Sequence, residues 1–501
     1  MKLSDLIKEC GVLATDGPLS VEITSLESDS RKVVPGSLFV AVNGCGNDGR
    51  AYIDAAIARG AVAVMYEEIP DQVGDDGKAA SSCPAATGHP VTRVLVESSR
   101  RAVAIAADRF WGHPSGSLKL VGITGTNGKT TTVTLLYNLM RGLGYECGML
   151  STIANYVGSE RLETANTTSD PVTINTLLAR MVEAGCAYCF MEVSSIGVEQ
   201  ERITGLEFAV GIFSNLTHDH LDYHKTFAEY LRCKKLFFDR LGSEATAIIN
   251  IDDKHGEVML QNCAAKPVRY SCKRIADHSC RIMEQGHEGM LLRIDGAEVW
   301  TRLIGAHNAY NLTAAYCTAL ALGVDKEEAL VGLSRLESAP GRLETIYGPR
   351  GLCAVIDYAH TPDALDNVLG TLREVSCGRT LVCLFGCGGD RDSSKRPEMA
   401  AVAQKWADRI FVTSDNSRSE RTEDIMDDIR KGFSREGLAK TVFIADRKEA
   451  IRAALQLSPD GSIVLLAGKG HETYQIIGAQ KTHFDEKEIV KEIFDQCCTI
   501  S

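Results

Sequence analysis

The 501-residue sequence lacks the features that mark three classes of protein. It has no run of about 18 apolar residues, so we expect no membrane-spanning helix. It has no basic excess, since 54 Lys and Arg stand against 66 Asp and Glu, and the net charge of −12 argues against a general nucleic-acid binder. The start, MKLSDLIKECGVL, has no apolar segment or cleavage site typical of a secretion signal, so we expect a cytoplasmic protein.

The sequence also lacks repeats, low-complexity tracts and a spaced cysteine framework. Its 17 cysteines are scattered through apolar runs, which predicts reduced and mostly buried thiols. Cys186 and Cys189 form a CxxC pair, but they lie on either side of the predicted start of a strand, and no second pair follows at zinc spacing. The pattern therefore does not favour a redox or metal site there.

The composition that remains is typical of a large globular chain. With 44% hydrophobic and 24% charged residues, a chain of this length predicts two to four domains at roughly 100–200 residues each. Residues 1–112 mix short β-rich runs with helical stretches and include a predicted surface loop over 69–91. From residue 118 onward, buried strand runs alternate with helices, which predicts an α/β fold with a mostly parallel sheet. Turn residues divide the chain into segments 1–112, 113–338 and 339–501.

Polar clusters directly follow four predicted strands in the last segment. They lie at residues 357–363, 386–396, 414–420 and 468–472. Because ligands bind at the carboxyl ends of strands in open α/β sheets, these clusters predict one shared site.

A glycine-rich turn lies between a predicted strand over 118–124 and a predicted helix over 130–143. Its residues are Gly125, Thr126, Asn127, Gly128, Lys129, Thr130 and Thr131. In such a loop, backbone N–H groups surround phosphate oxygens, the lysine reaches the β- and γ-phosphates, and the following threonine binds Mg²⁺. The strict spacing would place glycine at Ile123, so this is a variant loop, and a turn without nucleotide is the alternative interpretation.

Two further strand ends carry candidate metal ligands. Glu192 ends a hydrophobic strand, where a carboxylate needs a partner or a metal. The segment SNLTHDHLDYH supplies His220 among other polar residues, and oxygen and imidazole donors beside a triphosphate suit Mg²⁺. Further on, Lys234 and Lys235 lie on a predicted amphipathic helix, and the residues alone suggest a solvated pair.

Seven motifs in order resemble those of the Mur ligase family: TGTNGKTT, MEVSS, SNLTHDHLDYH, GAHNAYN, DYAHTPDALDN, GCGGDRD with KRP, and AGKGHE. The resemblance runs from residue 28 to the C-terminus. It implies an N-terminal uridine-nucleotide-binding domain (1–112), a central P-loop ATP-binding domain (113–338) and a C-terminal Rossmann-like amino-acid-binding domain (339–501). It also implies an ATP-dependent carbon–nitrogen ligase of cytoplasmic peptidoglycan precursor synthesis.

Within the family, the motifs are most similar to those of the member that adds meso-diaminopimelate to UDP-N-acetylmuramoyl-L-alanyl-D-glutamate. The resemblance implies an acyl-phosphate intermediate made from ATP, with ADP and phosphate as products. We expect these substrates, bound Mg²⁺ and a monomer.

The resemblance also assigns residues. The family holds the uridine end at positions matching Ser28, Ser30, Arg31 and Asn47, and the muramoyl-peptide at Thr167, Thr168, Ser194, Gln200 and Arg202. Its ATP contacts outside the loop match Asn308, Asn311, Arg342, Asp357 and His360. Lys234 matches a lysine that the family carbamylates with CO₂ to N6-carboxylysine, which bridges Mg²⁺ ions with Glu192 and His220; this replaces the solvated-pair interpretation. Catalysis is thus assigned to Lys129, Lys234, Glu192 and His220.

The incoming amino acid is assigned to a third group. Its members are Arg391, Asp415, Asn416, Ser417, Arg418, Gly468 and Glu472. Diaminopimelate-adding members carry D-N-P-R, whereas lysine-adding members lack the arginine. A guanidinium at Arg418 would bind the second carboxylate of diaminopimelate with two hydrogen bonds, and Glu472 would meet the distal ammonium. Structurally, Arg418 could instead be a simple helix-entry arginine.

Three positions depart from the family pattern. Ser417 replaces a proline whose φ is fixed, Ile196 stands where many members have histidine, and Ser169 stands where proline is usual. None of them removes a charged group assigned to the chemistry.

Three other functions remain to be separated from this one. A lysine-adding ligase predicts loss of Arg418, and a folylpolyglutamate-type ligase would lack the N-terminal SDSR segment. A P-loop ATPase acting as a switch or binding module would not explain the polar clusters after four strands.

Overall fold

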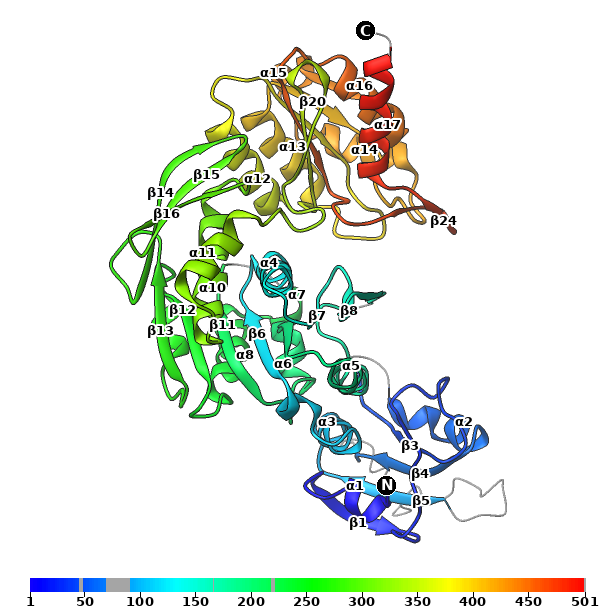
Figure 1. The fold of residues 1–501 in the computed structure, drawn as a ribbon. Coiled ribbons are helices and arrows are strands. Elements are labelled where there is room, and N and C mark those ends of the chain that lie inside the picture. The colour runs from blue at the N-terminus through cyan, green and yellow to red at the C-terminus, as the bar shows by residue number, and fades with distance from the viewer. Residues whose placement is uncertain (45–47, 69–90, 165, 218–220, 500–501) are drawn as a thin grey trace. The chain divides into compact units, whose positions relative to one another are not determined.

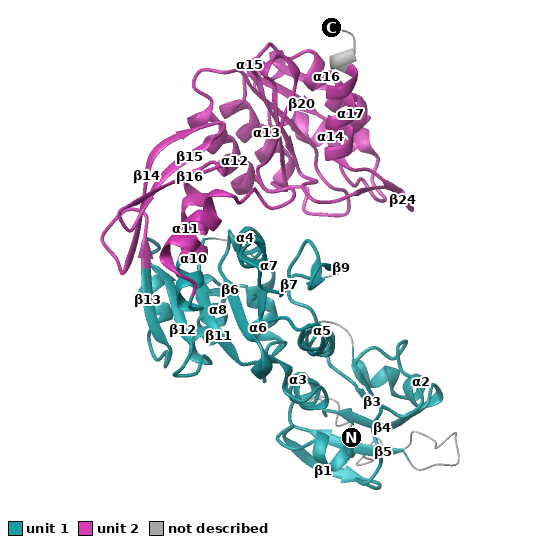
Figure 2. Cartoon of the chain, viewed as in Figure 1, with its two compact units in different colours: residues 1–269, 317–323 teal, residues 270–316, 324–501 magenta. Residues whose placement is uncertain are grey.

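The computed structural model describes residues 1–44, 48–68, 91–164, 166–217 and 221–499. It divides into two compact units, one formed by residues 1–269 and 317–323 and the other by residues 270–316 and 324–501 (Figure 2). The loop predicted over 69–91 lies outside the described residues except for its last position. Within the described residues, no helix is both long and apolar enough to cross a bilayer.

The first unit begins with a five-stranded sheet in the order β1-β5-β4-β3-β2 (Figure 1). Its strands are β1 (Val12–Asp16), β2 (Ser25–Glu27), β3 (Ser37–Val40), β4 (Ala61–Tyr66) and β5 (Thr92–Val96). The accompanying helices are α1 (Leu3–Leu6), α2 (Ile53–Ala58) and α3 (Ser99–Phe110). Alternate residues of β3, β4 and β5 meet α1 and α3 in one apolar cluster, so the β-rich runs of the sequence are confirmed as strands.

A second sheet of this unit carries the phosphate loop. Five neighbouring strands in the order β12-β11-β6-β10-β7 run parallel, as predicted. They are β6 (Lys119–Thr124), β7 (Cys147–Leu150), β10 (Tyr188–Glu192), β11 (Phe208–Phe213) and β12 (Thr246–Asn250). Short β8 (Asn155–Val157) and β9 (Glu160–Leu162) extend it antiparallel beyond β7. Helices accompany these strands: α4 (Lys129–Gly142), α5 (Pro171–Glu183), α6 (Ser195–Glu199), α7 (Leu221–His224), α8 (Phe227–Asp239) and α9 (Gly256–Met259).

The second unit contains a six-stranded sheet in the order β17-β18-β22-β19-β20-β21. Its strands are β17 (Glu344–Tyr347), β18 (Cys353–Asp357), β19 (Leu381–Phe385), β20 (Arg409–Val412), β21 (Thr441–Phe443) and β22 (Ile463–Ala467). All pairs are parallel except β17 with β18, so five strands end at one edge, as the polar clusters predicted.

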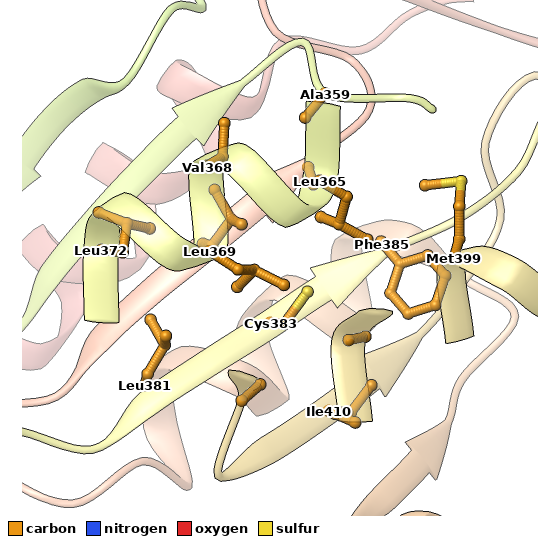
Figure 3. Close-up of a cluster of buried hydrophobic side chains, with 14 of the residues drawn as sticks. Ala359, Leu365, Val368, Leu369, Leu372, Leu381, Cys383, Phe385, Met399 and Ile410 are labelled. Carbon is orange, nitrogen blue, oxygen red and sulfur yellow. The ribbon is translucent and has the colours of Figure 1, made fainter. Parts of the chain in front are cut away.

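Helices pack on this sheet: α12 (Pro362–Val375), α13 (Lys395–Trp406), α14 (Thr422–Arg430), α15 (Arg435–Ala439), α16 (Arg447–Gln456) and α17 (Glu486–Thr499). Figure 3 shows leucines of α12 facing β19 in the larger of its two apolar clusters. A second cluster joins the opposite sheet face to α16 and α17. Both faces of the strands are therefore buried, which explains their continuous apolar runs.

Antiparallel strands are the part of the fold that the sequence did not reveal. Within the second unit, β14 (His278–Gly286), β15 (Gly289–Ile294) and β16 (Ala297–Thr301) form a meander, and β23 (Tyr474–Ile477) pairs with β24 (Gln480–His483). β13 (Lys266–Ser271) and α10 (Ala306–Ala321) cross the boundary between the units, and α11 (Lys326–Ser334) follows. Burial along the meander strands is mixed, with intermediate and exposed residues among the buried ones, a weaker signal than a continuous apolar run.

The cysteine prediction is confirmed for the described residues. The structure shows thirteen cysteines before residue 490 as free thiols, and ten of these are buried. Burial raises the pKa of several of these thiols, including Cys10 to about 11. Such thiols are protonated at neutral pH and are inert structural residues.

Candidate active site

The phosphate loop joins β6 to α4 in the first unit and has the conformation that its glycines predict. Gly125 has φ +156° and Gly128, directly before the helix, has φ +88°, a region that other residues rarely adopt. A Cβ at position 125 would lie 1.9 Å from the Ser214 Oγ, so the loop lies against the end of β11. Glycine is therefore required at 125 for the loop to approach its neighbour.

Residues after β11 hold this loop in place. Asn127 donates its backbone N–H to the Asn215 side chain at 2.9 Å, and the Ser214 hydroxyl donates to the Asn127 carbonyl at 2.7 Å. The Thr217 N–H donates to the Thr126 hydroxyl at 2.9 Å. Ser214 and Asn215 were not predicted from the sequence, because only the histidines and aspartates of the SNLTHDHLDYH motif suggested ligands.

The lysine of the loop folds back over it in this structure. Lys129 Nζ donates to the carbonyls of Gly125 and Thr126 at 2.8 and 2.9 Å. A cation is thus held at the N-terminus of α4, where backbone N–H groups and the helix dipole also favour an anion. The arrangement is suited to binding phosphate.

Thr130 and Glu192 meet beside the loop. Glu192 is buried at the end of β10; its Oε2 accepts a hydrogen bond from the Thr130 hydroxyl at 3.0 Å, and its Oε1 accepts one from the Thr152 N–H at 2.8 Å. The two predicted metal ligands on different elements therefore lie together. Their oxygen donors are those that Mg²⁺ prefers. His220, the third predicted side-chain ligand, lies outside the described residues.

Lys234 corrects the interpretation that the residues alone suggested. It is not a solvated lysine, because it is 1% exposed and its Nζ donates to the Gly125 carbonyl at 2.8 Å. Its ammonium also lies 4.6 Å from the ring centre of Tyr230, whose hydroxyl is 3.1 Å from the Thr126 hydroxyl. The structure thus places Lys234 against the phosphate loop, whereas Lys235 pairs with Asp239.

Four of the five residues assigned to the muramoyl-peptide form a connected group in the first unit. The Thr168 hydroxyl donates to the Glu192 carbonyl at 2.9 Å and lies 3.0 Å from the Ser194 hydroxyl. Arg202 donates to the Thr168 carbonyl at 2.5 Å and twice to the Gln200 side chain. Burial lowers the pKa of Arg202 from its ordinary value. Thr168 joins this group to the candidate metal ligand Glu192, because the Thr168 hydroxyl contacts the Glu192 carbonyl.

Thr167 is the fifth residue assigned to the muramoyl-peptide, and a separate set of residues is assigned to the uridine end. Thr167 accepts a hydrogen bond from Thr152 at 3.1 Å. Near the N-terminus, the Arg31 side chain donates three hydrogen bonds to Asp29, and together with one from the Arg31 backbone N–H they lower the pKa of Asp29 to about 2. Ser28 and Ser30 are partly buried on the same turn, and Asn47 lies outside the described residues.

The residues of the second unit that are assigned to ATP make contacts with protein groups of the same unit. Asn311 donates to Asn308 at 3.0 Å, and both amides are buried on α10. Arg342 lies 5.0 Å from the ring centre of Tyr358, to whose carbonyl the His360 ring nitrogen Nδ1 approaches at 2.8 Å.

Asp357, the last residue of β18, holds two backbone segments of this unit. Its two carboxylate oxygens accept the N–H groups of Leu343 and Ala359, each at 2.8 Å. Burial raises the pKa of this carboxyl above its ordinary value. Asp357 therefore fixes the backbone beside Arg342.

Most residues assigned to the amino acid meet at one edge of the six-stranded sheet. Asn416 donates its side-chain N–H to Glu472 Oε2 at 2.9 Å, although the two are 56 residues apart. Gly468 has φ +116°, and a Cβ there would lie 2.8 Å from Asp415 Oδ2. The DNSR and AGKGHE motifs thus form one cluster after β20 and β22.

Arg418 lies at the side of this cluster in an unusual backbone conformation. It is a non-glycine residue with φ +51°, and its Nη1 donates to the Gly389 carbonyl at 2.6 Å. Its Nε and Nη2 make no hydrogen bond to the residues that the structure describes. Arg391 is exposed nearby, with its Cγ 3.9 Å from where a Cβ on Gly388 would stand. The strained backbone argues against a simple helix-entry arginine.

Two buried cations in this cluster were missed by the sequence analysis. Lys469 Nζ lies 3.2 Å from Asn416 Oδ1 and 3.4 Å from Glu472 Oε2. Arg447 donates to the Ser414 and Ala467 carbonyls, the last backbone positions before Asp415 and Gly468. Lysine and arginine are rarely fully buried, so their residue type does not predict a buried position. Loop residues also follow no periodic pattern that would indicate which contacts they make.

Comparison with known proteins gives a consistent result along the chain. Three family models match in order: "Mur ligase family, catalytic domain" over 22–111, "Mur ligase middle domain" over 123–319 and "Mur ligase, glutamate ligase domain" over 341–470. Proteins of Cytophaga hutchinsonii and Parabacteroides distasonis are 46% and 48% identical over 495 residues, covering 99% of both chains in each case. Both are named UDP-N-acetylmuramoyl-L-alanyl-D-glutamate–2,6-diaminopimelate ligase.

Solved structures agree with this fold. A structure titled with the same ligase name is 30% identical, covers 99% of each chain and has a TM-score of 0.69. MurF from Acinetobacter baumannii, at 17% identity and a TM-score of 0.63 over 94% of each chain, shares the fold alone. The predicted three-domain α/β class is therefore confirmed, and the chain belongs to the Mur ligase family.

Proposed function

We propose that this protein is an ATP-dependent amide ligase that adds diaminopimelate to UDP-N-acetylmuramoyl-L-alanyl-D-glutamate in peptidoglycan precursor synthesis. The observation that carries the proposal is the cluster of Asn416, Arg418 and Glu472 at the sheet edge, which offers a cationic group and an anionic group to one amino acid. Relatives with this printed activity at 46–48% identity support it. The proposed domains are residues 1–112, 113–338 and 339–501.

ATP binds at the phosphate loop in this proposal. Backbone N–H groups after Gly125 and the N-terminus of α4 hold the phosphates, and Lys129 exchanges its loop carbonyls for the β- and γ-phosphate oxygens. Asn308, Asn311, Arg342, Asp357 and His360 are the proposed contacts to the rest of the nucleotide. The protein's part in phosphoryl transfer is then to position groups and neutralise charge.

The residues present fit a bound Mg²⁺. Thr130 Oγ1 and Glu192 are oxygen donors 3.0 Å apart beside the loop, with His220 proposed as a further ligand and Lys234, as a carbamate, as another. The metal would neutralise charge on the transferred phosphoryl group. Burial of Lys234 against the Gly125 carbonyl supports its place in this group.

The D-glutamyl carboxylate of the UDP-dipeptide accepts the γ-phosphoryl group and becomes an acyl phosphate. Thr167, Thr168, Ser194, Gln200 and Arg202 hold this peptide in the proposal, and Ser28, Ser30, Arg31 and Asn47 hold the uridine end. The diaminopimelate amine then attacks the activated carbonyl, an amide forms and phosphate leaves. Activation is needed because a carboxylate does not react with amines.

The two ends of diaminopimelate are distinguished by charge. Arg418, through its Nε and Nη2, binds the carboxylate of the distal end, which lysine lacks. Glu472 accepts a hydrogen bond from the distal ammonium. Asp415, Asn416, Ser417, Gly468 and Arg391 complete the proposed pocket.

The test is phosphate release from ATP with purified protein. We expect release only when both the UDP-dipeptide and diaminopimelate are present, with lysine a poor substitute. Arg418→Ala should raise KM for diaminopimelate roughly 10- to 100-fold, because a charge-assisted hydrogen-bonded pair is lost. Arg421→Ala, three residues away and 75% exposed, is the matched control and should leave KM unchanged.

The outcomes separate the alternatives. Preference of the unmodified protein for lysine would contradict the diaminopimelate assignment. Phosphate release with ATP alone would favour an ATPase switch.

A further inference from the structure

Lys469 is a buried cation within the cluster of Asp415, Asn416, Gly468 and Glu472 after β20 and β22, called the amino-acid cluster below. It lies on the loop after β22 and is 0% exposed, although lysine is almost never fully buried without a partner. Its ammonium lies 5.8 Å from the ring centre of Tyr474 and 5.9 Å from that of Phe484. Its side chain therefore has no solvent-exposed surface in this structure.

Its ammonium faces groups that the proposed function assigns to the substrate. Nζ lies 3.2 Å from Asn416 Oδ1, 3.4 Å from Glu472 Oε2 and 3.7 Å from Asp415 Oδ1. The side chains of Asp415 and Glu472 remain 11% and 16% exposed. The cation is therefore inside the cluster and the carboxylates are at its surface.

Glu472 is held by one oxygen and leaves the other open. Oε2 accepts hydrogen bonds from Asn416 Nδ2 at 2.9 Å and from Lys469, whereas Oε1 has no hydrogen bond to any residue in the described ranges. Asn416 is itself fixed, because its Oδ1 accepts the Ile476 N–H at 2.9 Å. The network thus holds Glu472 in one orientation.

The charges of Asp415, Lys469 and Glu472, counted apart from Arg418 at the side of the cluster, also suit an ammonium ligand. Asp415 and Glu472 bring two negative charges and Lys469 one positive charge, so together they carry one net negative charge. That charge matches a single ammonium group. Without Lys469 the two carboxylates would repel each other in a partly buried site.

We infer that Lys469 is a positioning residue for amino-acid selection: it fixes Glu472 so that Oε1 receives the distal ammonium of the incoming diamino acid. The inference rests on the proposed function and deepens it. Lys469 acts through Glu472 and is not a catalytic residue.

The experiment measures steady-state phosphate release for Lys469→Met, which removes the charge at similar side-chain length. We expect KM for diaminopimelate to rise roughly 10- to 100-fold, the range for loss of a charged hydrogen bond, while kcat and KM for ATP change less than about 3-fold. Lys448→Met is the control, because Lys448 forms an exposed ion pair with Glu492 on the same unit and should have no effect.

A double-mutant cycle with Glu472→Gln tests whether Lys469 acts through Glu472. In that background, Lys469→Met should raise KM less than about 3-fold further, because the carboxylate that Lys469 orients is already gone. Lys469→Gln, which keeps a donor without the charge, gives the same test if Lys469→Met does not fold.

Two outcomes would overturn the inference. One is an unchanged KM for diaminopimelate in folded Lys469→Met or Lys469→Gln protein, and the other is an equal effect in both Glu472 backgrounds. Failure of the proposed function is distinct, because the unmodified protein would then release no phosphate in response to diaminopimelate.

Discussion

The buried ion pair of Arg447 and Glu486 allows a prediction about how the amino-acid cluster is supported. Both side chains are 0% exposed, and Arg447 Nε donates to Glu486 Oε1 at 2.8 Å. The same guanidinium donates to the carbonyl of Ser414, two residues after β20, at 3.0 Å and to the carbonyl of Ala467, the last residue of β22, at 2.8 Å. Arg447 therefore joins the two strand ends that carry the cluster.

Arg447→Met should destabilise this unit strongly. Removing one partner of a buried ion pair costs about 3–5 kcal/mol, because the remaining charge is left without compensation. For a domain of this size, about 2–4 °C per kcal/mol converts that cost to a Tm decrease of roughly 6–20 °C. Thermal unfolding followed by circular dichroism measures it.

Two companion variants make the prediction specific. The double variant Arg447→Met with Glu486→Leu should recover much of the loss, since an apolar pair can replace a buried ion pair. Arg452→Met breaks an exposed pair with Glu449 on the same helix and should change stability by less than about 1 kcal/mol. A difference of 2 °C corresponds to about 1 kcal/mol at this size. A Tm for Arg447→Met within 2 °C of the Arg452→Met value would therefore contradict the predicted role of the buried ion pair.

Three further predictions follow from single positions. Gly125→Ala should lower kcat/KM for ATP about 100-fold, because its Cβ would lie 1.9 Å from Ser214 Oγ and displace the phosphate loop; ATP titration measures this. Ser417→Ala should leave the free energy of unfolding unchanged or raise it by up to about 1 kcal/mol in urea titrations, because the buried Ser417 hydroxyl has no hydrogen-bond partner in the described structure. The Asp29 carboxyl should titrate at about pH 2 by NMR, since Arg31 lowers its pKa.

The control for Gly125→Ala is Gly378→Ala. Gly378→Ala also has a positive φ, but its Cβ would meet no atom within 4 Å, so it should cost about 1–2 kcal/mol of stability and leave ATP use unchanged. Equal ATP kinetics for the two glycine variants would refute the loop argument. A loss above about 1 kcal/mol for Ser417→Ala would show a missing partner.

The sign of the Asp29 effect follows from its lowered pKa. The folded-state pKa is below the ordinary value, so the contact with Arg31 contributes above about pH 4 and is lost as pH falls through about 2. Arg31→Met should return the titration toward the ordinary value. A midpoint that does not move in Arg31→Met would contradict the pairing.

Parallel strands could be predicted from the sequence because both of their faces are buried. β18, β19 and β22 are buried at every position, so they appear as continuous apolar runs followed by polar residues. The meander of β14 to β16 has mixed burial, and no comparable run marks the three strands together.

Lys234 shows where a sequence signal existed but was not used. The buried face of α8 includes Tyr230, Lys234, Phe237 and Phe238, so the lysine lies on the apolar stripe at helical spacing. A lysine on such a stripe predicts a buried partner. Its partner, the carbonyl of Gly125, is 109 residues away and could not be predicted from local pattern.

The amino-acid cluster was predicted only in part for the same reason. Asn416, Arg418 and Glu472 were named through resemblance, whereas Lys469 and Arg447 were not. Their contacts depend on loops brought together by the sheet, and loop contacts have no periodicity.

Mass spectrometry of the UDP-linked product shows which amino acid the enzyme adds. With ATP, Mg²⁺, the UDP-dipeptide and an equimolar mixture of diaminopimelate and lysine, we expect one product that carries a single diaminopimelate residue in amide linkage. A product that carries lysine, or unchanged dipeptide despite ATP consumption, would contradict this expectation.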